Sequence, residues 1–99
     1  MPRPKKLKIV NGLPEYNLYG PINASEENSI LMSIEEYETI RLIDVEGLKQ
    51  EECAQRMQVG RITVQKLCAD ARYKIADLLV NGIVLKIEGG SYQINEKDE

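Results

Sequence analysis

The sequence predicts a mainly α-helical fold: a three-helix helix-turn-helix domain with an extended basic N-terminal arm and a C-terminal β-hairpin. Three observations predict it. Apolar residues recur at helical spacing in three successive segments, small residues fall where two of these helices would cross, and Gly89-Gly90 separates two alternating apolar stretches. At 99 residues the chain has room for one domain with a modest core.

The first helix is predicted to begin after Ser33. Ser33 and Glu36 have the spacing of a capping box, in which each side chain accepts a hydrogen bond from the backbone N–H of the other residue. Gly47 is predicted to end this helix as a left-handed cap. The apolar residues that follow Ser33 at helical spacing are Ile34, Tyr37, Ile40 and Ile43.

The second and third helices are predicted over Gln50 to Met57 and from Arg61 to about Val80. Ala54 is small where the two helices would approach closely, and Val59 would fill the turn between them. This is the pattern of a helix-turn-helix, whose second helix enters a DNA major groove. The pattern therefore predicts DNA binding.

Two apolar lines run along the third helix, and they have different predicted roles. The second line has the alternating spacing of a packing seam, and it would either pack against the C-terminal strands or form a surface for a partner chain. The line predicted to face the core contains Val64, Leu67, Cys68, Ala71, Ile75 and Leu78, and the second line contains Ala69, Tyr73, Ala76 and Val80.

The rest of the chain is predicted to flank the helices. Residues 1–32 are predicted as a basic arm and an irregular segment, with a short strand near Leu7 to Val10. Residues 33–81 are predicted to form the helix-turn-helix domain, and residues 82–99 the hairpin and an acidic tail. A two-residue turn at Gly89-Gly90 would place Ile87 opposite Tyr92 and Leu85 opposite Ile94.

The formal net charge of −3 is unevenly distributed along the chain. Residues 1–25 hold four basic residues against one acidic residue, and residues 61–86 hold five against two, so each segment carries +3. Residues 26–60 hold nine acidic residues against three basic ones. Because binding depends on the field over the contact face, this segregation is compatible with a nucleic-acid partner.

The core line fixes which residues of the third helix face outward. Gln65 can make a paired contact to adenine, and Arg61 or Lys66 can donate to guanine. Thr63 lies near the helix start, where the dipole favours a phosphate, and Arg72 is a candidate for a flanking phosphate. A solvated polar face is the alternative. The predicted DNA-binding residues are Arg61, Thr63, Gln65, Lys66, Arg72 and, for a minor groove, Arg3, Lys5 and Lys6 of the arm.

Other function classes have little support in the sequence. The chain has no histidine, and Cys53 and Cys68 fall at apolar helical positions, where reduced core thiols are expected. We therefore predict no enzyme activity, no metal site and no cofactor. No apolar run approaches the roughly 20 residues that cross a bilayer, and no secretion signal is apparent, so a cytoplasmic location without membrane contact is predicted.

Almost the whole chain resembles a known family. The matching segments are MPRPKK, EEYETIRLIDVEGLKQEECAQRM, VGRITVQKL and KIEGGSY, together with residues 13–21. They resemble uncharacterised protein family 0251, also called domain of unknown function 134, whose members are small prokaryotic predicted DNA-binding proteins. The resemblance implies a helix-turn-helix similar to region 4 of bacterial sigma factors, which reads promoter DNA.

These features together predict a sequence-specific transcriptional regulator that binds double-stranded DNA. One recognition helix covers few base pairs, so a homodimer is expected. Two alternatives stay open. The fold would dock on a protein such as RNA polymerase through the acidic first half, or it would bind structured RNA through the basic faces.

Overall fold

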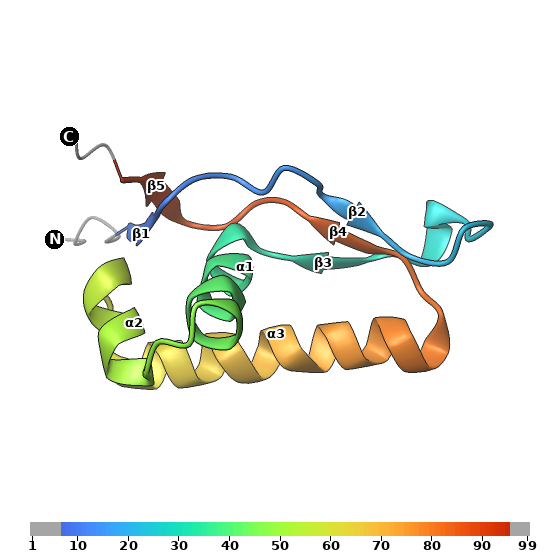
Figure 1. The fold of residues 1–99 in the computed structure, drawn as a ribbon. Coiled ribbons are helices and arrows are strands. Elements are labelled where there is room, and N and C mark those ends of the chain that lie inside the picture. Colours follow the sequence, from blue (N-terminus) through green and yellow to red (C-terminus); the bar gives the residue numbers. More distant parts are fainter. Residues whose placement is uncertain (1–6, 96–99) are drawn as a thin grey trace, which may run out of the picture.

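A computed structural model of the chain describes residues 7–95. It places three helices on one side and short strands on the other (Figure 1). The longest helix, α3 (Arg61–Asn81), runs along the molecule below the strands, and α1 (Ile34–Ile40) crosses between the two layers. Helix α2 (Gln50–Met57) lies at the end of the molecule where β1 (Lys8–Val10) and β5 (Tyr92–Ile94) also lie.

The strands form two small sheets that join the N-terminal and C-terminal parts of the chain. β1 pairs with β5 in parallel. In the other sheet β4 (Leu85–Ile87) is central, with β2 (Leu18–Tyr19) antiparallel on one edge and β3 (Ile30–Met32) parallel on the other. The buried face of this sheet carries Met32, Leu85 and Ile87, while Leu31 is exposed on the opposite face.

The predicted C-terminal hairpin is wrong, because β4 and β5 belong to different sheets. Gly89 and Gly90 do take positive φ values, 81° and 117°, but Glu88 N–H and the Gly89 carbonyl still pair with Met32 and Ile34. The strands they separate find other partners. β4 is paired along both of its edges and is buried against the helices, which satisfies more backbone groups than an isolated two-stranded hairpin would.

The segment predicted as irregular contains more structure than expected. The short strand near Leu7 to Val10 is confirmed as β1. The same segment also supplies β2, a 3-10 turn at Glu26–Asn28 and β3. These strands have two or three residues each, too few for alternation in the sequence to show. The parts predicted as separate flanks of the helices therefore pair with each other.

The helix boundaries follow the predicted capping signals. Ser33 N–H donates to Glu36 Oε1 over 2.9 Å, and Glu36 N–H donates to Ser33 Oγ over 3.2 Å, which confirms the capping box. Helix α1 continues as a π-helical stretch, Arg41–Val45, before Gly47 takes a φ of 80°. Helix α3 is continuous from Arg61 to Asn81, and Gly82 caps its C-terminal end with a φ of 65°.

Two clusters of buried side chains form the core. One lies between α1, α3 and the sheets and contains Val10, Met32, Ile34, Ala71, Leu85 and Ile87. The other lies where α2, α3 and the π-helical stretch meet and contains Leu42, Cys53, Ala54, Met57 and Val64. Among the helices of residues 7–95, none combines the length and apolar character needed to span a membrane.

The two apolar lines of α3 differ in burial. Val64, Cys68 and Ala71 of the core line are buried, as predicted, and Leu67 and Leu78 are half-buried, but Ile75 is 36% exposed. Ala69, Tyr73, Ala76 and Val80 are all exposed, so the interpretation that they pack against the C-terminal strands is wrong. The strands contact the opposite side of the helix, where Ala71 and Leu78 lie against the first cluster.

Both cysteines are free and buried, which confirms the prediction of reduced core thiols. Burial raises the pKa of the Cys53 thiol from its usual value near 9 to about 11. When folding raises the pKa of an acidic group, that group contributes to the stability of the folded state in full at pH values below its pKa in the unfolded chain. It loses that contribution as the pH rises through the folded pKa.

We therefore expect the free energy of unfolding to fall between pH 9 and about 11, with Cys53 supplying about 2 kcal/mol of the fall. Urea unfolding at a series of pH values would measure it. The informative quantity is the difference from Cys53→Ala, whose curve should be flatter. Identical slopes for the two proteins would contradict this assignment.

Candidate nucleic-acid interface

The turn between α2 and α3 is fixed by backbone and core contacts. Gln58 adopts the left-handed conformation, with φ 58° and ψ 48°, and ends α2. Val59 N–H then donates to the Ala54 carbonyl over 3.0 Å, and the Val59 side chain packs against the second core cluster. Gly60 precedes α3 in an extended conformation, so the helix begins at Arg61 as predicted.

Packing of α3 on the second cluster decides which side chains face outward. Val64 is completely buried and Cys68 nearly so, which turns the opposite face of the first helical turns to solvent. Arg61 and Lys66 are 58% and 76% exposed at their side chains, and Gln65 is also exposed. Three of the predicted base-contacting residues therefore share one accessible face.

Carboxylates lie close to the basic groups of this face. Arg61 donates through Nε to Gln50 Oε1 over 3.5 Å and lies 3.9 Å from Glu51 Oε2. Lys66 Nζ lies 3.0 Å from Asp70 Oδ2, one helical turn away. Exposed pairs of this kind contribute about 0–1 kcal/mol each, so a phosphate or base edge can replace these partners at little cost.

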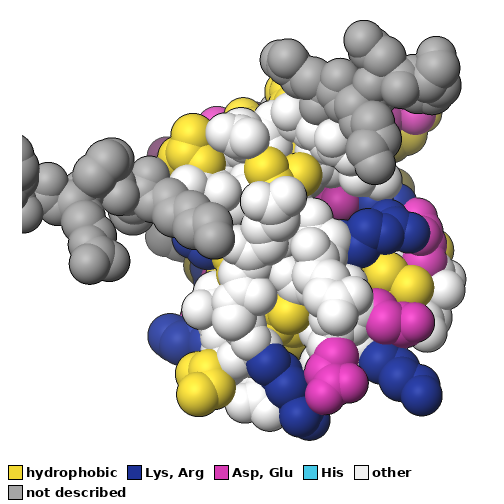
Figure 2. Space-filling view, turned by 90° about the vertical axis from the view of Figure 1, so that its left-hand side faces the viewer, with side chains coloured by type: hydrophobic (Ala, Val, Ile, Leu, Met, Phe, Trp, Pro, Cys, Tyr) yellow, Lys and Arg dark blue, Asp and Glu magenta, His cyan; other side chains and the backbone are white. Residues whose placement is uncertain are grey.

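Figure 2 looks onto the end of the molecule that carries α2 and the start of α3. Lys and Arg side chains occur along its lower part, with Asp and Glu side chains between them. The face is therefore mixed in charge rather than uniformly basic. A mixed face attracts a polyanion only weakly at long range, so recognition there would depend on direct contacts.

Arg72, the candidate for a flanking phosphate, is 56% exposed at its side chain and is paired with a carboxylate. Its guanidinium donates to both carboxylate oxygens of Asp44, over 3.1 Å from Nε and 2.5 Å from Nη2. This hydrogen bonding holds the pKa of Asp44 below its usual value. The pair ties α3 to the π-helical stretch, so Arg72 has a structural partner. Lys74, two residues further along the helix and on another side of it, is likewise held by Glu36 at 2.7 Å.

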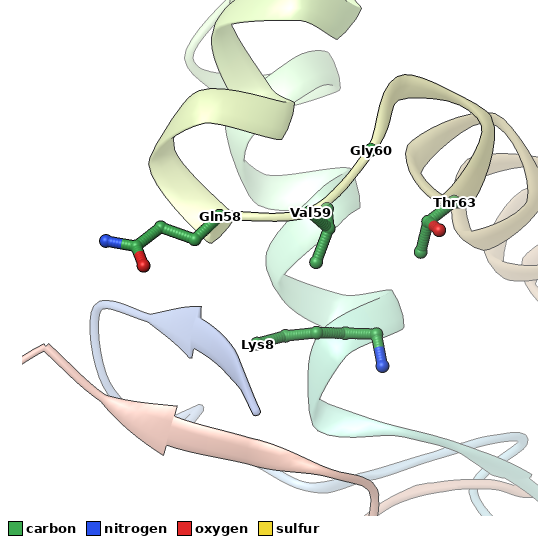
Figure 3. Close-up of a pocket in the computed structure, with 5 residues that line it drawn as sticks. All are labelled: Lys8, Gln58, Val59, Gly60 and Thr63. Carbon is green, nitrogen blue, oxygen red and sulfur yellow. The ribbon is translucent and has the colours of Figure 1, made fainter. Parts of the chain in front are cut away.

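Lys8, which is not among the residues predicted to contact DNA, also lies at this end of the molecule. Together with Gln58, Val59, Gly60 and Thr63 it lines an open hollow of about 380 Å³. In Figure 3 the Lys8 side chain extends beneath Val59, and its ammonium group lies on the side of Thr63. Thr63 is half-buried at the start of α3. The hollow thus brings together an ammonium group, a hydroxyl group and the N-terminal end of a helix.

Strand pairing places Lys8 in the hollow. β1 is held by β5, and Lys8 Nζ lies 3.5 Å from Glu35 Oε2 of α1. The basic run at the start of the sequence contains Lys8, but nothing in that run indicates which lysine would approach α3. The predicted arm residues Arg3, Lys5 and Lys6 lie outside the described residues.

One family model and several related proteins match this chain. The family model described as "Protein of unknown function DUF134" matches residues 1–95. A UPF0251 protein from Desulfitobacterium hafniense strain Y51 is 55% identical over 96 residues, which cover 95% of this chain and 77% of the relative. A UPF0251 protein from Caldicellulosiruptor bescii is 50% identical over 92 residues, covering 93% of this chain and 65% of the relative.

A more distant UPF0251 protein from Chlorobaculum tepidum is 42% identical over 100 residues, which cover 99% of this chain and 51% of the relative. No solved structure matches the chain. Because the family model spans residues 1–95 and these relatives align over nearly all of the chain, the protein belongs to the UPF0251 family, the family described as DUF134.

Proposed function

We propose that this protein binds double-stranded DNA and acts as a sequence-specific transcriptional regulator, with α2, the turn and α3 as its helix-turn-helix. The observation that carries the proposal is the exposed face of the first turns of α3. Arg61, Gln65 and Lys66 lie there on a rigid helix whose opposite side is packed in the core. Their side chains match the base edges that a major groove presents.

The backbone contacts would come from the same end of the molecule. Thr63 and Lys8 line the hollow at the start of α3, and the helix N-terminus adds backbone N–H groups that favour an anion. A phosphate of the DNA strand beside the groove is the group that this arrangement suits. Arg3, Lys5 and Lys6, if they reach an adjacent minor groove, would add further contacts.

The salt dependence of binding follows from these contacts. If the arm, Lys8 and α3 together neutralise about six phosphates, affinity should fall by on the order of a thousandfold between 50 and 200 mM salt. The protein's own net charge of −3 means that little binding should remain without direct contacts. A flat response to salt would argue against DNA as the ligand.

A mobility-shift experiment tests the proposed interface. Sequences are first selected from a random duplex pool with the full chain, and the affinity of variants for the selected duplex is then measured. Changing Arg61, Gln65 and Lys66 together to alanine should weaken binding by at least about a hundredfold, because each good base contact contributes about 1–3 kcal/mol.

The matched control changes Arg56 and Lys86 to alanine. It removes the same number of positive charges, one from α2 and one from the sheet. This control should bind nearly as well as the parent protein. Equal binding by the triple variant and the parent would overturn the proposed interface. Selection of hairpin RNA in preference to any duplex DNA would favour the RNA alternative instead.

A further inference from the structure

The far side of α3 is an apolar surface without a partner among residues 7–95. Tyr73 is 70% exposed and Val80 is 79% exposed, and the small residues Ala69 and Ala76 lie on the same line. In Figure 1 the core and the strands lie above α3, and no element lies beneath it. Large apolar side chains that line up along a helix are typical of an interface rather than of a solvated face.

We propose that a second copy of this chain covers this surface, with the two α3 helices packed in parallel around a two-fold axis. The interface runs from Ala69 to Val80. Its residues follow one another at spacings of four, three and four, which is the repeat that keeps a seam between two helices in register. A two-fold axis lets the same patch serve both copies.

Charge complementarity decides the direction of the two helices. Arg72 and Asp77 stand on opposite flanks of the seam. In a parallel pair, Arg72 of each copy lies beside Asp77 of the other, because flanking residues five positions apart meet across such a seam. An antiparallel pair would instead place Asp70 of one copy beside Asp77 of the other, which is repulsive. The Arg72 contacts to Asp44 use Nε and Nη2 and leave the Nη1 donors for the second copy.

The same seam continues to Lys66 and Ile62, where the charge pattern changes. Lys66 of both copies would meet on the axis in a parallel pair, and two like charges there oppose close packing. The paired segment therefore ends near Ala69, and the first turns of α3 diverge. This leaves Arg61, Gln65 and Lys66 accessible in the dimer.

The parallel arrangement also turns the α2 ends of both copies to the same side of the dimer, since α2 lies beside the start of α3. One duplex could then contact both copies, whereas an antiparallel pair would point these ends in opposite directions. This consequence for DNA rests on the proposed function, but the interface itself does not. Selected duplexes should carry inverted repeats.

The interface is small. A seam of about three helical turns buries less than the roughly 800 Å² per partner of a standard stable interface. The dimer should therefore be weak and concentration-dependent in the absence of DNA. Sedimentation equilibrium of the full chain from about 1 µM to about 500 µM is the measurement that detects it.

The expected result is reversible dimerisation of the parent protein in that range. Ala76→Glu should weaken it by at least about tenfold, because two carboxylates would face each other on the axis. The matched control is Val45→Glu, which places the same charge at a 76% exposed position of the π-helical stretch. Unchanged circular dichroism of Ala76→Glu shows that the loss is not unfolding. A parent protein that stays monomeric throughout, or an Ala76→Glu variant that still dimerises, overturns the proposal.

Asp77→Lys tests the direction of the helices. In the parallel pair it sets lysine beside Arg72 of the second copy, so dimerisation should weaken by at least about tenfold. In an antiparallel pair it removes a carboxylate repulsion, so dimerisation should strengthen, and that outcome overturns the parallel arrangement. All of these measurements are made without DNA. Loss of DNA binding with an intact dimer would therefore count against the proposed function alone.

Discussion

Replacing Leu42 with alanine should lower the free energy of unfolding by about 2–5 kcal/mol. Leu42 is completely buried in the π-helical stretch and packs where Ala54, Met57 and Val64 meet. Removing its side chain loses the free energy gained by burying apolar surface. It also leaves a cavity, because the surrounding side chains cannot move far enough to fill it. Because this cluster sets the positions of α2 and α3, the same substitution should also weaken any binding at the proposed DNA interface.

Urea unfolding followed by circular dichroism would measure the effect. The matched control is Val45→Ala, three residues further along the same stretch, where the side chain is 76% exposed. That substitution should change the free energy of unfolding by no more than about 0.5 kcal/mol. A loss below about 1 kcal/mol for Leu42→Ala would contradict close packing of the second cluster around Leu42.

Gly90→Ala should be the most damaging single glycine substitution, at about 3 kcal/mol. Gly90 has a φ of 117°, a conformation that side chains disfavour. An added Cβ would also lie 1.8 Å from Glu35 Oε1 and 3.2 Å from Ser33 Cβ. Glu35 cannot easily move away, because its other oxygen accepts a hydrogen bond from Ser91 N–H over 3.1 Å and lies near Lys8.

Two other glycines separate the contributions to this loss. Gly89 has a φ of 81° but open space where a Cβ would be, so Gly89→Ala should cost only the strain of about 1–2 kcal/mol. Gly12 has neither a positive φ nor a near neighbour, so Gly12→Ala should be nearly neutral. The three variants are compared by thermal and urea unfolding.

The contact with Glu35 can be isolated by a double-mutant cycle. Gly90→Ala should cost less in a Glu35→Ala background than in the parent chain, because the clashing oxygen is then absent. The two costs would be equal if the strain at Gly90 were purely conformational. Glu35 Oε1 is buried and lacks a hydrogen-bond partner in the described structure, which fits an oxygen held tightly against the Gly90 backbone.

Local signals were enough to predict the helices. Ser33 and Glu36 cap α1 through contacts between residues three apart, and Gly47 takes the left-handed conformation that was predicted for it. None of these signals needs a distant partner. The periodicity of α3 then fixed its buried side, and with it the exposure of the residues proposed to touch DNA.

The candidate site was predicted less completely. Arg61, Gln65 and Lys66 are accessible as expected, but Arg72 is held by Asp44, which lies 28 residues away in the chain. Lys8 was missed because its place beside Thr63 depends on the pairing of β1 with β5, which joins the two ends of the described chain. No pattern around either residue indicates such a neighbour.

The sequence by itself determined where the three helices begin and end and which face of α3 is buried, because capping and helical periodicity act between residues a few positions apart. Only the tertiary structure decided the strand pairing. A turn at Gly89-Gly90 favours a hairpin locally, yet Leu85 and Ile87 bury more apolar surface and satisfy more backbone groups between β2 and β3. Strands of two or three residues have little preference of their own, so long-range packing chose their partners.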